Sequence, residues 1–160
     1  MDIQSLNALY APLDTRSQAL LSLLREAFPR TTQGWYNGHY AKNAEGEYEL
    51  HHFPIPEVNV KGLCDVELHF DAVYISSKLH RTHALAFNYE LLQNVPFEAY
   101  GVEDYLKDFY LPGMTHEQLI SAIIASSERE IGFSFRFPTD TLDTDLVDFI
   151  QLLHFEGFHN

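Results

Sequence analysis

Four polar side chains alternate with apolar ones in one short segment of the chain: Asp65, Glu67, His69 and Asp71. Carboxylate and imidazole groups are ligands that proteins use for Zn²⁺, Mn²⁺ and Fe²⁺. Successive residues on one face of a strand are about 7 Å apart, which is too far for one strand to form a tight site alone. A metal site here therefore needs a ligand from a neighbouring strand.

The candidates for that ligand are His51 and His52, which stand in an earlier segment with strand character. With His69, Asp65 and Asp71 they would give a mixed carboxylate–imidazole site, and hydrolysis by a metal-bound hydroxide would be its natural reaction. The simpler interpretation is that the polar row is the water-facing side of a sheet, because no spacing in it is specific to a metal family. We favour this interpretation and assign no metal or other cofactor.

Other reactive side chains have similarly simple explanations. Cys64 falls on the apolar side of the same alternation, so we expect a small buried side chain and not a nucleophile. The basic segment 78–83 is interpreted as a surface loop that can receive an anion. Trp35, Tyr36 and Tyr40 could line a ligand pocket, although aromatic residues on a hairpin more often pair across its strands.

Motifs for nucleotide binding and metalloprotease activity are absent. The sequence contains neither a Gly-x-Gly-x-x-Gly loop nor a phosphate-binding P-loop. His116 and Glu117 begin a zinc-protease pattern, but Ile120 stands where the second histidine ligand is required. No catalytic residue is assigned.

The composition limits the possible partners. The 160 residues include 10 Lys and Arg against 23 Asp and Glu, which gives a formal charge of −13. Proteins bind nucleic acids and anionic membrane surfaces through positively charged residues. We therefore predict neither as a partner of this acidic chain. The acidity serves either solubility or an acidic face that docks a basic protein partner. Self-association, for example as a dimer, is the other possibility that we consider.

The cysteine content and the first residues indicate a location. A single cysteine excludes an internal disulfide, which is typical of proteins in reducing compartments. The N-terminal residues show neither the basic segment nor the apolar run of a signal peptide, and no stretch is long enough to span a bilayer. We expect a cytoplasmic protein.

Hydrophobic periodicity predicts the elements in the first part of the chain. An amphipathic helix is expected over 15–28, opened by a capping box. An aromatic hairpin follows, with strands over 35–40 and 48–53. Pro54 and Pro56 are expected to end its second strand, because proline cannot donate a hydrogen bond to a neighbouring strand.

The clearest pattern lies in the middle of the chain. Cys64, Val66, Leu68 and Phe70 are apolar at alternate positions, which predicts a strand with one buried face and one in water. After Asp71 the alternation changes phase, and we expect either a β-bulge near Asp71 and Ala72 or passage into a region buried on both faces.

The remaining elements complete the expected fold. We predict, in order, a strand at 85–89, helices at 102–111 and 115–130, a strand at 133–137 and a helix at 143–155. One helix followed by several strands, and then alternating helices and strands, is an α+β order. The expected architecture is a single domain over 1–160, with an antiparallel sheet of four to six strands and about four helices packed on one face.

No activity follows from the sequence alone. We predict a non-enzymatic protein-interaction module that uses an acidic face or exposed aromatic residues. The first alternative is a small metal-dependent hydrolase built on the row around His69. The second is a small-ligand carrier with an aromatic pocket at Trp35.

Overall fold

The computed structural model describes residues 3–42, 44–86, 99–104, 107–110, 117, 121, 124 and 129–160, with side chains described outside 3–7, 36–42, 48–54, 99–104 and 107–110. Within these ranges the chain forms one seven-stranded antiparallel sheet in the order β1-β2-β3-β4-β7-β5-β6. Its strands are β1 (Thr31–Lys42), β2 (Tyr48–Val60), β3 (Cys64–Leu68), β4 (Val73–His80), β5 (Ala99–Asp104), β6 (Lys107–Tyr110) and β7 (Glu130–Phe137). The helices are α1 (Ile3–Ala27), α2 (Arg81–Ala86) and α4 (Asp143–Phe155). The α+β class with an antiparallel sheet is confirmed, although the described ranges hold seven strands where four to six were expected and three helices where about four were expected.

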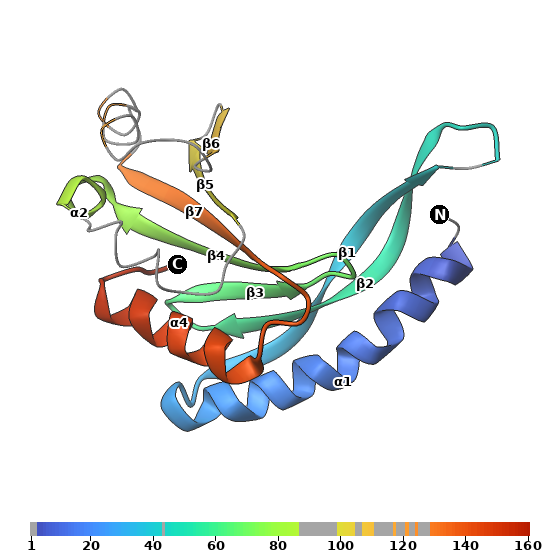
Figure 1. Cartoon of the computed structure of the whole chain (residues 1–160), viewed down its shortest axis with the longest axis horizontal. Coiled ribbons are helices and arrows are strands. Elements are labelled where there is room, and N and C mark those ends of the chain that lie inside the picture. The colour runs from blue at the N-terminus through green and yellow to red at the C-terminus, as the bar shows by residue number, and fades with distance from the viewer. Residues whose placement is uncertain are drawn as a thin grey trace.

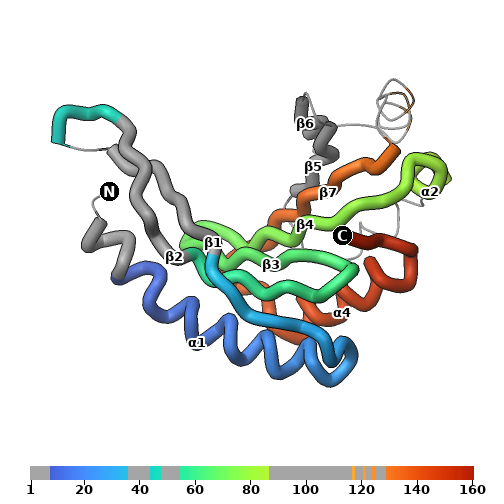
Figure 2. Tube along the Cα trace, turned by 180° about the vertical axis from the view of Figure 1, so that it is seen from behind, coloured from blue at the N-terminus to red at the C-terminus, as the bar shows by residue number. Residues whose placement is uncertain are grey.

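The long helices α1 and α4 cover one face of the sheet, and neither of them lies on the other face (Figure 1). The reverse view shows the same two helices on one side of β1 to β4 (Figure 2). The hydrophobic core lies between these layers, where Phe135 and Phe137 of β7 each meet Phe149 of α4 edge to face, with ring centroids 4.9 Å apart. Within the described residues, α1 and α4 therefore leave the opposite face of the sheet uncovered.

The alternation predicted for the middle strand is confirmed. Cys64, Val66 and Leu68 are fully buried, whereas Asp65 and Glu67 between them are partly exposed. Strand β7 alternates in the same way over its whole length, with its odd-numbered residues buried. Both strands thus present one apolar face to the helices and one polar face to the outside.

Helix α1 begins well before the predicted start at Thr15. It runs from Ile3 and contains Pro12 in its interior. Tyr10 is buried, which continues the buried face of the helix to the N-terminal side of the proline. Tertiary packing of this face outweighs the hydrogen bond that Pro12 cannot donate. Neither α1 nor another helix in the described ranges is both long and apolar enough to cross a membrane.

The predicted hairpin forms, but its second strand does not end at the prolines. Strand β2 continues through Pro54 and Pro56 to Val60. Strand β3 pairs with β2 only from Glu57 onward, so the prolines lie where β2 has β1 on one side and no β3 on the other. Proline is tolerated at such a strand edge because no neighbour requires its missing N–H group.

A tight turn replaces the bulge expected near Asp71. Leu68 pairs with Val73, and the His69 N–H donates to the Ala72 carbonyl at 3.0 Å, which closes a hairpin between β3 and β4. Phe70 lies in this turn and is 37% exposed, so the prediction that it is buried with the strand residues was wrong. The strand ends at Leu68, so the period-two alternation does not predict which residues after Leu68 are buried.

Three further predictions for the second half of the chain need correction. Residues 78–83, expected as a loop, form the end of β4 and the start of α2, and residues 85 and 86, expected in a strand, lie in α2. Within the helix expected over 102–111, residues 102–104 belong to β5 and residues 107–110 to β6, and these two strands form a hairpin. Of the helix expected over 115–130, only residues 117, 121 and 124 are described as helical, and the rest lies outside the described residues apart from 129 and 130, which are not helical.

Arg16 fastens α1 to the segment that leads into α4. Its Nε forms an ion pair with Asp143 at 3.0 Å, and its two terminal nitrogens donate to the carbonyls of Thr139 and Thr141. A guanidinium group suits this role because its donors spread in one plane. The contact fixes both helices on the same face of the sheet.

Candidate functional site

Carboxylates face each other on the side of the sheet that α1 and α4 leave uncovered. Glu57 of β2 lies directly opposite Glu67 of β3, and Asp65, opposite Asn59, lies two pairs further along on the same face. Side chains directly opposite on antiparallel strands have Cβ atoms about 4.5–5.5 Å apart. Like charges at this separation repel each other, so this part of the surface holds an arrangement that costs stability.

Burial and the neighbouring carboxylates both disfavour the ionised form of Glu57. Partial burial raises the pKa of Glu57 above its ordinary value, and the charges of Asp65 and Glu67 raise it further. A hydrogen bond from the side chain of Asn59 acts in the opposite direction and is the smallest of these effects. A positive charge beside Glu57 and Glu67 would relieve the repulsion.

A depression of about 450 Å³ lies beside Glu67. Its lining combines two carboxylates, two aromatic rings, an imidazole and two hydroxyls: Glu67, His69, Phe70, Asp71, Tyr74, Ser76 and Ser134. Ser76 and Ser134 are directly opposite each other on β4 and β7. Because serine side chains are short, this pair leaves space between the larger groups on either side.

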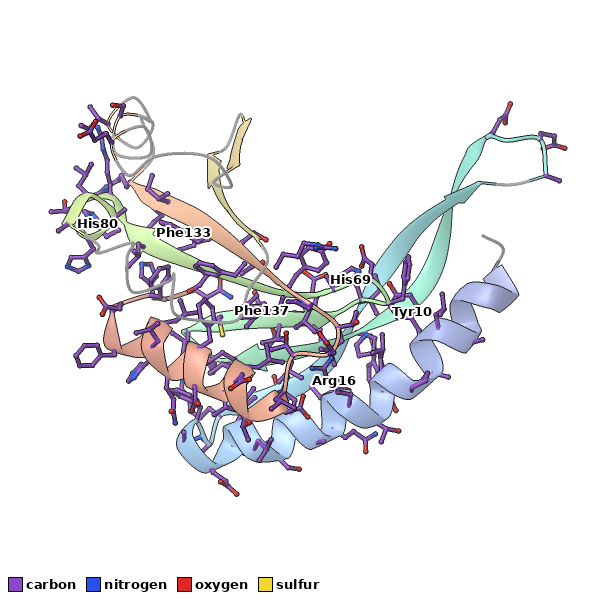
Figure 3. The ribbon with its side chains drawn as sticks, viewed as in Figure 1. Tyr10, Arg16, His69, His80, Phe133 and Phe137 are labelled. Carbon is purple, nitrogen blue, oxygen red and sulfur yellow. The ribbon has the colours of Figure 1, made fainter. Side chains whose placement is uncertain are left out.

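A line of three polar side chains connects α1 to this depression. The Tyr10 hydroxyl lies 3.4 Å from His69 Nδ1, and His69 Nε2 lies 3.2 Å from Glu67 Oε1. A neutral His69 protonated on Nε2 satisfies both contacts, since it donates to Glu67 and accepts from Tyr10. Figure 3 shows Tyr10 and His69 near each other at the end of the β3–β4 hairpin.

Aromatic contacts fix the orientation of the His69 ring. Tyr74 meets it edge to face, with centroids 5.0 Å apart, and Arg136 Nε in turn lies 3.4 Å from the Tyr74 hydroxyl. Tyr10 also meets the ring of Phe70, with centroids 5.9 Å apart. Burial raises the pKa of Tyr10 above its ordinary value, although a hydrogen bond with the Phe70 backbone lowers it in part. Tyr10 therefore acts as a neutral hydroxyl.

The structure brings only part of the proposed metal cluster together. Glu67 contacts His69, and Asp71 lines the same depression, but Asp65 accepts a hydrogen bond from Asn160 Nδ2 at 2.6 Å. Both ring nitrogens of His69 contact protein groups, so a metal ion would have to displace one of them. Among the described side chains, no three His, Cys, Asp or Glu residues are grouped so that they could hold a metal ion.

The side chains of His51 and His52 lie outside the described residues, but their backbone positions are known. The register of β2 with β3 pairs residue 57 with residue 67, so position 55 would face residue 69 if the pairing continued. At about 3.3 Å per residue, His51 and His52 are roughly 10–13 Å further along the strand. The backbone therefore separates them from His69.

Two further side chains of potentially reactive type, Cys64 and Ser77, have structural roles. Cys64 is fully buried, as predicted, and burial strongly raises the pKa of its thiol, so it is not a thiolate nucleophile at neutral pH. Ser77 is buried and donates to the Leu63 carbonyl at 2.6 Å. The neighbouring Lys78 is exposed, and adjacent strand residues point to opposite faces, so these two side chains do not form a catalytic pair.

The aromatic cluster of the first hairpin is only partly described. Trp35 is 57% exposed and does not line the depression beside Glu67. It pairs with Pro56, one position away from the Gly34–Glu57 pair, so alternation directs it to the face opposite Glu57. The side chains of Tyr36 and Tyr40 lie outside the described residues.

Tyr10 is one of the site residues that the sequence analysis missed, together with Glu57, Tyr74, Ser76 and Ser134. The helix was predicted to start at Thr15, so Tyr10 was not placed on any element. The helical spacing of Tyr10, Leu13, Ser17 and Leu20 was the available signal, and Pro12 concealed it.

Comparisons with known proteins show the fold and no activity. No protein-family model matches the chain, and no curated protein matches it. A solved structure, a conserved hypothetical protein from Pyrococcus furiosus, is similar with a TM-score of 0.65 and 18% sequence identity, over 97% of this chain and 98% of that chain. This likeness supports the same arrangement of sheet and helices and carries no functional residue to this chain.

Proposed function

We propose that the chain is a non-enzymatic protein-interaction module that receives a basic side chain of a protein partner in the depression beside Glu67. The bound group is a guanidinium or ammonium group, held by the carboxylates of Glu67 and Asp71. The observation that carries the proposal is the meeting of these carboxylates with the rings of Phe70 and Tyr74 in one depression.

The lining suits such a group for two reasons. A carboxylate accepts charge-assisted hydrogen bonds from Arg or Lys, and the faces of aromatic rings attract cations. The repulsion between Glu57 and Glu67 provides a third contribution, because a bound positive charge converts an unfavourable pair into a favourable group of three. An interaction module can retain such a costly pair, whereas solubility alone does not require two acidic residues directly opposite each other.

The overall charge favours a basic protein segment over other ligands. A net charge of −13 accelerates the approach of a positively charged partner and repels nucleic acid. The contacts of His69 favour a binding role over proton transfer, since both of its ring nitrogens already contact Tyr10 and Glu67. We therefore advance no enzymatic reaction.

A titration with a short basic peptide tests the proposal. An acetylated and amidated tetra-arginine peptide is added to the full chain, and binding is followed by isothermal titration calorimetry at about 50 mM NaCl. We expect one peptide per chain, and we expect Glu67→Gln to weaken binding by about tenfold because one charge-assisted contact is lost.

The matched control is Glu26→Gln, which removes the same charge from an exposed position on α1. If the peptide binds only through the overall negative charge, both variants weaken binding equally. That result, or the absence of binding to the wild-type chain, would refute the proposal.

A further inference from the structure

A second depression, of about 260 Å³, lies at the opposite end of β3 from the turn that carries His69. It is lined by Ala27, Phe28, Pro29, Arg30, Lys61 and His154. Three of these six side chains carry or can carry a positive charge, and none is acidic. This is unusual in a chain whose acidic residues outnumber its Lys and Arg by 23 to 10.

Three separate elements bring these side chains together. Arg30 stands in the turn between α1 and β1, Lys61 in the turn between β2 and β3, and His154 in the last turn of α4. Gly62 adopts a φ of +79°, which allows the tight turn beside Lys61, where the Leu63 N–H donates to the Val60 carbonyl at 2.9 Å. The convergence is therefore a property of the tertiary fold.

Among the described side chains, Arg30 and Lys61 lack the protein partners that Arg16, Arg25 and Arg81 have. Arg16 bonds to Asp143, and Arg25 and Arg81 each donate to a backbone carbonyl. Within the described part of the chain, Arg30 and Lys61 form no ion pair or hydrogen bond. Their charges are thus free to meet a ligand.

An aromatic ring adds an apolar wall to this charged site. Phe28 is half-buried and packs against the core, and His154 meets its ring edge to face, with centroids 5.6 Å apart. The backbone of Phe28 is held firmly, since its N–H donates to Leu24 and its carbonyl accepts from both the N–H and the hydroxyl of Thr31. The wall is therefore in place before any ligand arrives.

We propose that this depression binds a small organic anion: a phosphate or carboxylate group held by Arg30 and Lys61, on an apolar body that packs against Phe28. The net negative charge of the protein does not prevent this, because exposed charges further away than about 8–10 Å are largely screened at physiological salt. The C-terminal ends of α1 and α4 lie nearby, but the Phe28 and Glu156 N–H groups bond to carbonyls in the last turns of these helices and reduce the exposed negative charge.

Titrations of the full chain with three probes test this site. Phenyl phosphate, phenylacetate and inorganic phosphate are each followed by two-dimensional ¹H–¹⁵N NMR. We expect saturable shifts at Arg30 and Lys61 amides with phenyl phosphate or phenylacetate, and the tighter of the two identifies the anionic group. Inorganic phosphate is expected to bind several-fold more weakly, because it lacks the apolar body.

Variants separate the charged from the apolar part of the proposal. Arg30→Gln and Lys61→Gln are each expected to lower the affinity for the tighter-binding aromatic probe by about tenfold. Phe28→Leu is expected to reduce the affinity for the aromatic probe and to leave the affinity for inorganic phosphate unchanged. Lys78→Gln, an equal charge change at an exposed residue of β4, is expected to leave binding unchanged.

Three results would overturn the inference. The first is no saturable binding of either aromatic probe. The second is equal weakening by Lys78→Gln, which would show attraction to positive charge in general. The third is equal affinity for inorganic phosphate and the aromatic probes, which would show that Phe28 does not contribute to binding.

Discussion

Replacement of Glu57 by Gln is expected to make the protein more stable and a weaker binder of cations. The change keeps the size and the hydrogen-bonding capacity of the side chain and removes one of two charges that lie directly opposite each other, the other being Glu67. Two unit charges about 5 Å apart repel by roughly 0.8 kcal/mol in water-like surroundings. Measured effects of cross-strand charge pairs are of the same order, about 0.2–1 kcal/mol. We therefore expect Glu57→Gln to raise the free energy of unfolding at pH 7 by about 0.5–1 kcal/mol.

The pH dependence of this gain shows whether it comes from the ionised form of Glu57, which burial and the neighbouring charges both disfavour. The pKa of Glu57 is raised above its ordinary value of 4.5, so the native state holds this proton to a higher pH than the unfolded chain does. The contribution of Glu57 to stability consequently falls as the pH rises from the ordinary pKa through the raised one, and it stays low at higher pH. The advantage of the Gln variant should be present at pH 7 and should largely disappear near about pH 4.

Urea unfolding followed by circular dichroism measures the free energy of unfolding of both proteins at pH 7 and at about pH 4. In a chain of this length, about 0.5–1 kcal/mol corresponds to a rise in melting temperature of roughly 1–4 °C, so the calorimetric midpoint provides a second readout. Glu26→Gln on α1 is the control, and it should change stability little at either pH. The reasoning is refuted if Glu57→Gln is less stable than the wild type at pH 7, or if its gain is the same at both pH values.

Three further predictions concern single contacts. Arg16→Lys should lower the free energy of unfolding by about 1–3 kcal/mol, because one ammonium group cannot replace the three directed donors of the guanidinium; a urea midpoint equal to that of the wild type would contradict the role of Arg16 as a clamp between α1 and α4. Tyr10→Phe should cost about 0.5–1.5 kcal/mol in the same assay and should shift the NMR signals of the His69 ring; unchanged ring signals would show that the hydroxyl does not contact this histidine. Leu68→Ala should destabilise the fold by about 2–5 kcal/mol, whereas Phe70→Ala, in the adjacent turn, should cost clearly less; equal costs would contradict the end of β3 at Leu68.

Local alternation was sufficient to predict the central strands. In β3 the apolar residues Cys64, Val66 and Leu68 repeat with period two, and the structure buries all three. The last helix, α4, was predicted with its correct ends, because its buried face repeats at helical spacing. These elements lie at the core, where local pattern and tertiary packing agree.

Predictions failed where tertiary contacts decide the structure. Residues 102–110 have a helical spacing of apolar side chains, yet β5 pairs with β7 and forms the edge of the sheet together with β6. Pro54 was interpreted as the end of a strand because a single sequence does not show which edge of β2 lacks a neighbour. Phe70 was assigned to the buried row because the turn that follows Leu68 has no glycine or proline to mark it.

The candidate site was predicted in part. The polar row around Glu67 and His69 follows from alternation alone. The contact between His69 and Tyr10 depends on how α1 crosses the end of the β3–β4 hairpin. These residues are 59 positions apart in the sequence, so no local pattern indicates that they touch. The cationic depression at Arg30 and Lys61 was not predicted for the same reason, since its side chains come from three distant turns.

The two prolines in β2 also limit how copies of this protein can join edge to edge. A strand added along the side of Pro54 and Pro56 that β3 leaves unpaired would meet positions without a donor, so the ladder could not continue there. Among the described strands, β1 and β6 are the outer members of the sheet and keep their full sets of backbone donors, because neither contains proline. Among the described strands, a strand added along β1 or β6, at opposite ends of the sheet, therefore meets no missing donor, whereas one added beside Pro54 and Pro56 meets two.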